Sequence, residues 1–455
     1  MARVHILGIC GTFMGGIALI ARELGYQVTG SDQNIYPPMS DTLQAAGVII
    51  QEGYDPAQLR PLPDLLIVGN TISRGNPALE HALNKNLPYI SGPQWLAEAV
   101  LHKRQVIAVS GTHGKTTTSS LLTWILTQAN LNPGYLIGGV PFNLPATAAL
   151  GKSPFFVIEA DEYDTAFFDK RSKFLHYRPR TLVINNLEYD HADIFPDLEA
   201  IKKQFQFLLR TVPSSGSVIY PADDPEIPDV LMRGCWASTQ TVGTAESVWH
   251  ARNKNADGSR FELWHRDQKL GQVKWSLVGD HNVRNALAAA AAAHEVGVTS
   301  EAVISGLKSF QGVKRRLEVI GTANEITVYD DFAHHPTAIA STLAGLRAKV
   351  GDKRIIAVLQ FASNTMSAGV HRDQLAQSLR LADKVVLLRP EKWDISALLR
   401  DLGNKAIAHE RVEAIIDYLA DMTQAQDQIL IMSNKSFEAI HQRLLKRLNN
   451  PVAVT

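Results

Sequence analysis

The chain has 455 residues, about three times the length of an average domain, and 45% of its residues are hydrophobic while 20% are charged. We therefore expect a soluble globular protein with more than one hydrophobic core. The 45 lysine and arginine residues balance the 45 aspartate and glutamate residues, which excludes an overall field that would attract nucleic acid or an anionic membrane.

The cysteine content and the N-terminus indicate where the protein works. Two cysteines, Cys10 and Cys235, are too few for a secreted disulfide framework, so we expect a reducing, cytoplasmic environment. No apolar run approaches the ~18 to 20 residues of a membrane span. The first apolar run, at residues 4–7, leads into a glycine turn, which is typical of a first strand and not of a signal peptide. We expect no membrane or nucleic-acid partner, and a monomer or weak homodimer.

The N-terminal part of the chain alternates short aliphatic runs with segments of helical length. The predicted strands lie at residues 4–7, 27–29, 48–50, 65–68 and 89–90. Such alternation predicts a parallel, doubly wound, Rossmann-like sheet. A polar stretch at residues 102–105 precedes the next apolar run, so we expect the first domain to cover residues 1–104.

A glycine-rich turn, GICGTFMGG at residues 8–16, joins the first predicted strand to the first helix. In a Rossmann-like sheet such a turn lets a diphosphate approach the backbone, and an acidic residue after the second strand, here Asp32 beside Ser31, accepts a ribose hydroxyl. Cys10 replaces the middle glycine of the dinucleotide-binding pattern. The alternative interpretation is a tight packing turn without a ligand.

The second segment repeats the alternation and predicts a central domain over residues 105–312. Long helices are expected after Lys115 and after Asp197, and period-two alternation between residues 242 and 277 predicts antiparallel strands that decorate the domain. We expect a parallel sheet of the P-loop ATPase type with this small β extension. The predicted strands lie at residues 106–109, 135–138, 155–158, 181–184 and 217–220, and two further helices at 282–295 and 300–309.

The stretch SGTHGKTTT at residues 110–118 lies between an apolar strand and a helix and resembles a P-loop. In that interpretation backbone N–H groups hold phosphates, Lys115 reaches the β- and γ-phosphate oxygens, and the Thr116 hydroxyl binds Mg2+. The full pattern asks for glycine at the position of Val109. The alternative is a glycine-rich turn with a surface lysine, but the order of strand, Gly-Lys-Thr and helix favours a nucleotide site.

Two further predicted strands end in polar residues. Glu159 ends one apolar run and opens the acidic stretch EADEYD, and His191 follows another strand in NNLEYDH. Hard cations prefer carboxylate ligands, and the carboxyl ends of parallel strands meet at one edge of a sheet. The alternatives are a solvated acidic loop and a histidine without a functional role. We predict that Glu159 and His191 serve a metal or phosphate site.

The last segment predicts a third α/β sheet over residues 313–455. A proline at position 336 is suited to the first turn of a helix. The predicted strands lie at residues 325–329, 354–360, 383–387 and 428–432, and the helices from 336 and at 371–380, 411–420 and 436–448.

Polar clusters flank the boundary between the second and third segments. Asn282 and Asn285 share one helix face, Arg316 belongs to a basic run, and Asp331 and His335 follow a strand. Each cluster has two interpretations: it is a ligand site, or it is a helix cap or a solvated part of the surface. Their recurrence at strand ends favours a site.

The order of these motifs resembles that of the ATP-dependent Mur ligases of peptidoglycan synthesis, over essentially the whole chain. The resemblance implies three α/β domains, ATP and Mg2+ as cofactors, and a C-terminal domain that binds the peptide and closes over ATP. In members that bind UDP-N-acetylmuramate, the N-terminal glycine turn and the GSD aspartate hold a UDP-sugar in place of NAD. The motifs are GTHGKTTT, EADEYD, NNLEYDHADIF, GDHNVRNALAA, GVKRRLE and DDFAHHPTA.

By motif position, the resemblance implies roles for individual residues. The catalytic set is Lys115, Glu159, His191 and Arg316, and the metal set is Thr116, Glu159 and His191. The ATP-binding set is Gly111, Thr112, His113, Gly114, Lys115, Thr116, Thr117, Asn282, Asn285, Asp331 and His335. The UDP-sugar-binding set is Gly8, Gly11, Thr12, Met14, Gly15, Ser31 and Asp32. Several relatives hold a second metal with a carbamylated lysine where this chain has Gln206, which implies no carbamate here unless Lys202 or Lys203 substitutes.

The segments GNTISRGNP, SGPQW, FFDKRSKF and SNTM imply particular substrates within the family. These are UDP-N-acetylmuramate and the murein tripeptide L-alanyl-γ-D-glutamyl-meso-diaminopimelate recovered from old cell wall. The alternative is the addition of L-alanine alone in de novo synthesis. In either case the sugar acid would take the γ-phosphoryl group of ATP, and the acyl phosphate would then react with an amine.

Two other classes of protein stay open at this stage. An NAD-dependent oxidoreductase would use the first glycine turn but would leave the P-loop without a role. A P-loop switch or motor would use Lys115 and Glu159 and would hydrolyse ATP without an amine or carboxylate co-substrate.

Overall fold

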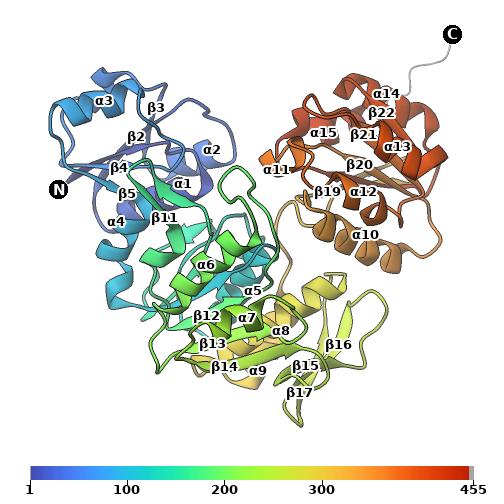
Figure 1. Ribbon diagram of the computed structural model, residues 1–455, viewed down its shortest axis with the longest axis horizontal. Coiled ribbons are helices and arrows are strands. Elements are labelled where there is room, and N and C mark those ends of the chain that lie inside the picture. The colour runs from blue at the N-terminus through green and yellow to red at the C-terminus, as the bar shows by residue number, and fades with distance from the viewer. Residues whose placement is uncertain (1, 450–455) are drawn as a thin grey trace.

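The computed structural model describes residues 2–449 and arranges them in three α/β domains, each built around its own sheet (Figure 1). In Figure 1 the N-terminal sheet is blue, the central sheet runs from cyan to yellow, and the C-terminal sheet is orange to red. This architecture confirms the predicted fold class. The domain boundaries after residues 104 and 312 stay predictions, and residues 1 and 450–455 of the predicted outer domains lie outside the described residues.

The first sheet has five parallel strands in the order β3-β2-β1-β4-β5. The chain leaves the central strand β1 toward one edge and returns to build the other edge from β4. The loops after β1, β2 and β4 therefore border one crevice. The strands are β1 (Arg3–Leu7), β2 (Gln27–Asp32), β3 (Ile49–Glu52), β4 (Leu65–Val68) and β5 (Tyr89–Ser91). The helices are α1 (Thr12–Glu23), α2 (Met39–Ala45), α3 (Pro77–Asn84) and α4 (Gly92–Ala99), with 3-10 turns η1 (Pro56–Leu59) and η2 (Leu101–Lys103).

The central sheet has ten strands in the order β17-β16-β15-β14-β13-β12-β6-β9-β7-β8. Because β6 pairs in parallel with both β9 and β12, the loops that follow these three strands lie together at one edge. The strands are β6 (Gln105–Ser110), β7 (Gly134–Leu136), β8 (Ala148–Ala149), β9 (Phe155–Glu159), β12 (Thr181–Ile184), β13 (Ser217–Pro221), β14 (Ser238–Gly243), β15 (Trp249–Arg252), β16 (Arg260–His265) and β17 (Gln268–Lys274). The helices are α5 (Lys115–Gln128), α6 (Leu198–Leu209), α7 (Ile227–Met232), α8 (Asp280–Glu295) and α9 (Ser300–Ser309).

A small antiparallel hairpin stands apart from the central sheet. It consists of β10 (Asp164–Ala166) and β11 (Asp169–Ser172), and the 3-10 turn η3 (Lys173–His176) follows it directly. The hairpin lies on the side of the N-terminal domain, since Phe168 at its tip packs edge-on against Tyr89 of β5 with ring centroids 5.1 Å apart.

The C-terminal sheet has six strands in the order β18-β19-β23-β20-β21-β22, of which only β18 is antiparallel to its neighbour. The strands are β18 (Glu318–Ala323), β19 (Ile326–Asp331), β20 (Ile355–Leu359), β21 (Lys384–Leu388), β22 (Ala406–His409) and β23 (Gln428–Met432). The helices are α10 (Pro336–Val350), α11 (Asn364–Ser367), α12 (Arg372–Ser378), α13 (Ser396–Leu402), α14 (Val412–Met422) and α15 (Ile440–Asn449), with 3-10 turns η4 (Gly403–Lys405) and η5 (Phe437–Ala439).

The structure adds strands that the apolar pattern does not predict. The strand β14 has the polar sequence STQTVG and is largely unburied, and β22 is half-buried along its length. The predicted small β extension between residues 242 and 277 consists of β15, β16 and β17, which continue the central sheet, with β15 parallel to β14 and the other two pairs antiparallel. Backbone hydrogen bonds to a neighbouring strand hold these segments without an apolar run of their own.

The clusters of buried side chains do not follow the division of the chain into three sheets. One continuous cluster joins α1 of the N-terminal domain, with Ile17 and Ile20, to the central domain, with Leu136 and Leu182. The buried side chains of the C-terminal domain form separate clusters on the two faces of its own sheet. The first two domains are therefore packed as one apolar body, and the third has an independent core.

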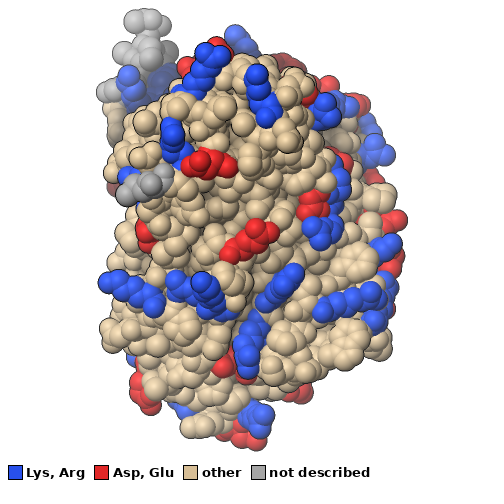
Figure 2. Space-filling view, turned by 90° about the vertical axis from the view of Figure 1, so that its left-hand side faces the viewer, with Lys and Arg blue, Asp and Glu red and all other residues tan. Residues whose placement is uncertain are grey.

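The charged side chains on the surface reflect the equal numbers of acidic and basic residues in the sequence. Figure 2 shows lysine and arginine side chains mixed with aspartate and glutamate side chains over the face that it presents. Among residues 2–449, no helix is long and apolar enough to cross a bilayer.

Candidate functional site

The turn between β6 and α5 depends on two glycines in the left-handed region, Gly111 with φ 116° and Gly114 with φ 79°. A Cβ atom on Gly111 would lie 2.8 Å from the backbone oxygen of Asn186, and one on Gly114 would lie 2.5 Å from Oδ1 of Asn285. A side chain at either position would be both strained and too close to its neighbour. The turn therefore needs glycine at both positions, and it leaves the N-terminal end of the long helix α5 free to bind an anion.

Lys115 is the first residue of α5, and its ammonium group is buried against acidic residues. Its Nζ donates to the backbone oxygen of Gly111 at 2.7 Å and to Oε2 of Glu162 at 3.0 Å, and Oδ1 of Asp161 lies 3.6 Å away. Burial alone would lower the pKa of Lys115, but the charges of Glu162 and Asp161 outweigh it and raise that pKa. The lysine is therefore a fixed positive charge at the start of the helix.

The next side chain along, Thr116, faces the strand end predicted to bind a metal. Its Oγ1 donates to Oε1 of Glu159 at 2.8 Å, and the other carboxylate oxygen of Glu159 accepts from the backbone N–H of Gly138 at 2.6 Å. Burial and the neighbouring Asp161 raise the pKa of Glu159. A carboxylate and a hydroxyl thus meet in a buried place that favours a nearby cation, and both are oxygen ligands of the kind that Mg2+ takes.

His191 is connected to Thr116 and Glu159 through other side chains. Its Nε2 lies 3.1 Å from Oε1 of Glu162, so Glu162 stands between His191 and Lys115. Burial would lower the pKa of His191, but Glu162 reverses the shift and raises it. Among the described residues, Glu159, Glu162 and His191 do not form a compact group of ligand atoms. The structure therefore brings Thr116 to Glu159 directly and joins His191 to them only through Glu162 and Lys115.

Glu162 is a site residue that sequence reasoning did not assign. It is 3% exposed, and Lys115 and His191 lower its pKa to about 2 although its burial acts in the opposite direction. The acidic stretch EADEYD indicated that carboxylates gather here, but the sequence does not show which of the four contacts the lysine.

Arg316 carries the site across the boundary to the C-terminal domain. Its guanidinium lies 4.9 Å from the centre of the Phe332 ring and has an Nη2 atom 3.4 Å from Oγ1 of Thr116. Asp331 accepts from the backbone N–H groups of Leu317 at 2.7 Å and Ala333 at 2.8 Å. Asp331 therefore joins the backbone just after Arg316 to its own loop after β19, and Arg316 points at the predicted metal pair.

The two asparagines of α8 lie beneath the glycine turn. Asn285 accepts from the Thr118 hydroxyl at 3.1 Å and its amide lies 3.4 Å from Oδ1 of Asn282, whose own amide donates to the backbone oxygen of Val278 at 2.8 Å. Of the two, Asn285 contacts α5 directly. Asn282 is bonded instead to the backbone just before its own helix.

A second group of ligand atoms spans the same boundary. Atoms of His113 in the turn, Glu188 after β12 and His335 before α10 all lie within 4.8 Å of one another. Burial lowers the pKa of His335 to about 3, whereas the proximity of His113 outweighs burial and lowers the pKa of Glu188 to about 2. The Thr337 hydroxyl also donates to Glu188 at 2.6 Å. The group joins the central and C-terminal domains and has the chemistry of a divalent-metal site.

The crevice of the N-terminal sheet is a cavity of about 850 Å³. Of the residues predicted to bind a UDP-sugar, Gly8, Gly11, Thr12, Met14 and Asp32 line it. Gly15 and Ser31 are not among its lining residues. Gly15 packs inside α1, and the Ser31 hydroxyl is taken by His5 and Gln58, each within 2.8 Å. The lining residues that sequence reasoning did not assign include Tyr36, Tyr54, Asn70, Thr71, Ser73, Arg74, Asn76 and Lys173.

Most of these unassigned residues follow β4, in the segment GNTISRGNP. The apolar run of β4 shows where the strand ends, so the sheet topology alone would have placed this segment at the crevice. Lys173 is different, because it belongs to η3 of the central domain and reaches the cavity from outside the N-terminal sheet.

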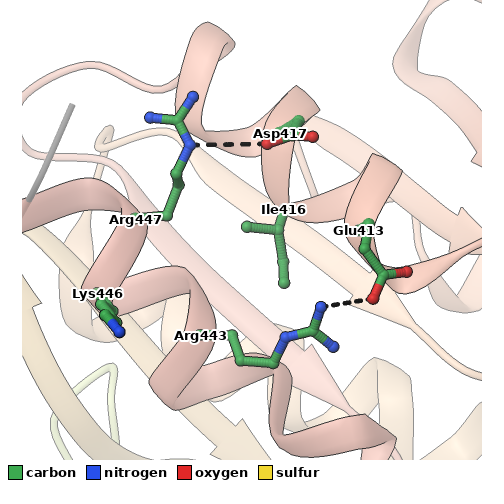
Figure 3. A pocket seen from close by; sticks show the side chains of 6 residues that line it. All are labelled: Glu413, Ile416, Asp417, Arg443, Lys446 and Arg447. Carbon is green, nitrogen blue, oxygen red and sulfur yellow. Dashed lines mark hydrogen bonds and ion pairs between the residues drawn. The ribbon is translucent and has the colours of Figure 1, made fainter. Parts of the chain in front are cut away.

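Another cavity, of about 400 Å³, lies between α14 and α15 (Figure 3). Ion pairs border it, with Arg443 2.6 Å from Glu413 and Arg447 3.6 Å from Asp417. None of the predicted site residues line this cavity.

Lys202 does not have the free amine that a carbamate would need. Its ammonium group is paired with Glu226, with Glu199 at 3.1 Å and with Asp229 at 3.2 Å, and these contacts raise its pKa. Gln206 donates to the backbone oxygen of Arg233. The neighbouring Lys203 is exposed.

The fold and the site together define a P-loop nucleotide-binding enzyme. The turn between β6 and α5, called the phosphate turn below, lies near the cavity of the N-terminal domain, where a second ligand can bind. Three domain descriptions match the chain in order: the Mur ligase family catalytic domain at residues 3–104, the Mur ligase middle domain at 109–293 and the Mur ligase glutamate ligase domain at 315–435. The chain belongs to the Mur ligase family, as its relatives below establish.

Two curated relatives carry the name UDP-N-acetylmuramate–L-alanyl-γ-D-glutamyl-meso-2,6-diaminoheptandioate ligase. The one from Haemophilus influenzae is 52% identical over 98% of this chain and 99% of its own length, and the one from Escherichia coli is 54% identical over 98% of each. Further relatives named UDP-N-acetylmuramate–L-alanine ligase are 32–35% identical. A crystal structure of a murein peptide ligase from Psychrobacter arcticus is 47% identical, with a TM-score of 0.79 and full coverage of both chains.

Proposed function

We propose that this chain is an ATP-dependent ligase that joins UDP-N-acetylmuramate to the tripeptide L-alanyl-γ-D-glutamyl-meso-diaminopimelate and releases ADP and phosphate. The observation that carries the proposal is that the phosphate turn and the large cavity adjoin. Lys173 lines the cavity, and its backbone N–H donates to the oxygen of Tyr163, the residue after Glu162. The relatives that share more than half of the residues carry the name of this reaction, which favours the tripeptide over L-alanine alone.

The UDP-sugar belongs in the cavity of the N-terminal domain. Gly8, Gly11 and Thr12 present backbone at the start of α1, where a diphosphate is favoured by the helix end. Both carboxylate oxygens of Asp32 already accept backbone N–H groups, from Cys10 at 2.8 Å and Asn34 at 3.0 Å. We infer that Asp32 shapes the turn as well as bordering the ligand.

ATP belongs at the turn between β6 and α5. The N–H groups of Gly114 to Thr117 and the ammonium of Lys115 bind its β- and γ-phosphates, and Asn285, Asp331 and His335 border the rest of the nucleotide. Thr116 and Glu159 would hold Mg2+, which would supply positive charge to the transferring phosphoryl group. Arg316 contacts Thr116 directly, and His191 is connected to this position through Glu162 and Lys115.

The chemistry follows from what the substrates lack. A carboxylate has no leaving group that an amine can displace, so one carboxylate oxygen of the muramyl group attacks the γ-phosphorus and ADP departs. The peptide amine, having lost a proton to solvent, then attacks the acyl carbon, and the C–O bond to phosphate breaks. Lys115 and Arg316 stabilise the negative charge on the phosphoryl oxygens during the first step.

The C-terminal domain completes the site when it lies against the central one. Arg316 reaches Thr116 from beyond the boundary, and Thr337 of α10 donates to Glu188. We infer that this domain binds the peptide and that its closure brings the arginine to ATP. The predicted oligomeric state and the cytoplasmic location stay predictions.

The test is ADP release by the purified chain with ATP, Mg2+ and UDP-N-acetylmuramate, in separate reactions with the tripeptide and with L-alanine. The expected result is ADP release with the tripeptide and little with L-alanine. A preference for L-alanine would assign the chain to de novo synthesis instead. ADP release without any co-substrate would indicate a P-loop switch or motor, and reduction of a nicotinamide would indicate an oxidoreductase.

A further inference from the structure

Lys173 is a buried lysine whose charge has no direct partner. It is 6% exposed, and its Nζ makes no ion pair and no hydrogen bond with any of the described residues. The contacts of the ammonium group are two aromatic rings, those of Phe13 and Tyr163, each with its centre 5.1 Å away. Such contacts hold a cation weakly compared with an ion pair.

The acidic residues around Lys173 are already engaged. Asp161, Asp164 and Glu162 act on it only at longer range. Glu162 is bound to Lys115 and His191, and Asp164 is paired with Lys170 at 2.6 Å. Burial is the largest influence on Lys173 and lowers its pKa. A buried ammonium without a counter-ion is costly, so the site favours an incoming anion.

The position of Lys173 indicates which anion it meets. Its side chain lines the N-terminal cavity next to Phe13, in the first turn of α1, and its backbone is bonded to Tyr163 beside the acidic residues that hold Lys115. The lysine therefore stands where the cavity meets the phosphate turn. A UDP-linked sugar acid has a diphosphate, which belongs at the glycine turn, and a carboxylate, which must reach the γ-phosphate.

We propose that Lys173 binds the carboxylate of the UDP-linked sugar acid and directs it at the phosphate held by Lys115. The inference rests on the proposed function. One carboxylate oxygen pairs with the Lys173 ammonium, and the other attacks the γ-phosphorus as the bond to ADP breaks. Lys173 keeps its proton throughout, so it is a substrate-binding and positioning residue and does not act as a base.

The hairpin that precedes Lys173 holds it in place. Asp164 and Ser172 pair across the two strands, and the tip residue Phe168 packs on Tyr89 of the N-terminal domain. The hairpin is therefore braced against the domain that holds the UDP-sugar. This bracing fixes the lysine relative to the cavity before the substrate enters.

The experiment compares Lys173→Met with wild type, using Lys152→Met as a control. Lys152 is an exposed lysine of the same domain and does not line the cavity. Binding of two probes is measured by calorimetry: UDP-N-acetylmuramate, and UDP-N-acetylglucosamine, which has the same diphosphate and no carboxylate. Turnover with the tripeptide is measured alongside.

We expect Lys173→Met to weaken UDP-N-acetylmuramate binding on the order of 30-fold or more, and to change UDP-N-acetylglucosamine binding by less than about twofold. Turnover should fall as well, and Lys173→Arg, which keeps the charge, should recover part of both losses. Lys152→Met should match wild type. Equal losses for both probes would place Lys173 at the diphosphate and overturn the proposal, as would no loss for either.

The design separates this proposal from the proposed function. If wild type itself failed to bind UDP-N-acetylmuramate or to release ADP, the function would be wrong and Lys173 would not be the cause. Correct folding of each variant is checked by binding of a non-hydrolysable ATP analogue. If Lys173→Met does not fold, Lys173→Gln, which keeps a polar end, is judged by the same difference between the two probes.

Discussion

Acidic residues hold the ammonium group of Lys115 in the structure. The phosphates of bound ATP would take their place as partners of this group. The ammonium group donates to both the Gly111 backbone oxygen and Glu162, which places it at the turn between β6 and α5. When a triphosphate binds, its oxygens compete for this ammonium with a carboxylate that remains buried behind it. The lysine therefore needs no long movement to serve the phosphates.

Replacement of Lys115 should separate the two ligand sites. We expect Lys115→Ala to lower turnover on the order of 10³-fold or more, because the positive charge at the transferring phosphoryl group is lost. Binding of UDP-N-acetylmuramate in the N-terminal cavity should stay within about twofold of wild type. Steady-state kinetics and calorimetry measure the two quantities, with Lys152→Ala, an exposed lysine, as control. Loss of both together would contradict a division of roles between the domains.

Several histidines are buried in a neutral form, and this makes stability depend on pH. Burial lowers the pKa of His5 and of His334 to about 4 each, and that of His335 to about 3. In the unfolded chain each would titrate near 6.5. Between these values the unfolded state binds protons that the folded state does not, so stability falls as the pH drops from about 6.5 toward 4.

His5 offers a clean test, because it lies away from the phosphate turn with both ring nitrogens bonded, to Thr29 and Ser31 at 2.8 Å each. Its pKa shift corresponds to about 3 kcal/mol of stability lost by pH 4. We expect His5→Gln to reduce the pH dependence of the free energy of unfolding over this range by up to one proton. Urea titrations at a series of pH values measure it. His102→Gln, changed at an exposed side chain, should keep the wild-type slope; a wild-type slope in His5→Gln would refute the assignment.

At this scale the sequence predicts contiguous motifs and misses partners brought by loops. Lys115, Thr116 and Glu159 are identifiable because each stands at a fixed place on a strand end or helix start. Glu162 and Lys173 are not, since their contacts depend on the path of the chain through residues 160–173. No periodicity encodes that path, so an acidic cluster can be seen without knowing which acid faces the lysine.

At the scale of elements, the turn between β6 and α5 is set by close backbone approach. Gly111 lies with its Cα so near the chain at Asn186 that a Cβ would stand 2.8 Å from that residue's backbone oxygen. Asn186 also accepts from the backbone N–H of His113 at 2.7 Å. The loop after β12 therefore holds the phosphate turn in place, and the conformation of the turn depends on that loop.

A single methyl group should disturb this arrangement. We expect Gly111→Ala to lower stability by about 1–3 kcal/mol and to weaken binding of a non-hydrolysable ATP analogue more than tenfold, because the backbone must move away from Asn186. The control is Gly25→Ala, where φ is also positive at 89° but nothing lies within 4 Å of the added atom. Thermal unfolding and calorimetry measure both. Equal effects in the two variants would show that backbone strain alone, and not the clash, determines the outcome.

Element boundaries are predictable where burial is continuous and not where backbone pairing substitutes for it. The apolar runs that end at Val68 and Ile184 mark β4 and β12 correctly. The polar strand β14 is invisible to the same pattern, because its residues are held by the ladder with β13 and by no apolar face. The two-residue strand β8 is too short to give any periodic signal.

At the scale of the whole molecule, the two domain boundaries differ in kind. The cluster that contains Ile17 and Leu182 runs without interruption from the N-terminal domain into the central one. The C-terminal domain contacts the central one through polar pairs, such as Asn364 with Asp193 at 2.8 Å and Thr337 with Glu188 at 2.6 Å. Polar contacts exchange with water at little cost, so the third domain can move while the first two stay together.

Neither this difference nor the strand order can be read from the sequence. Alternating strands and helices predict parallel sheets, and this is correct for the N-terminal sheet and for the parallel strands that make up most of each of the other two sheets. Which strand lies next to which is decided by packing between segments far apart in the chain, as when β23 inserts between β19 and β20. The placement of Arg316 at Thr116 depends on that packing and on the domain contact, so the residue pattern alone gives its charge, and a role in the site was expected only from the family resemblance.

The separate core of the C-terminal domain predicts two unfolding transitions. Leu430 in β23 and Leu182 in β12 are both fully buried, the first in the C-terminal core and the second in the shared one. Each change to alanine should cost about 2–5 kcal/mol through lost contacts and a cavity. In scanning calorimetry of the full chain, Leu430→Ala should lower the transition of the C-terminal domain alone, and Leu182→Ala should lower the transition shared by the first two domains. A single transition that shifts equally in both variants would mean that the polar boundary couples all three domains.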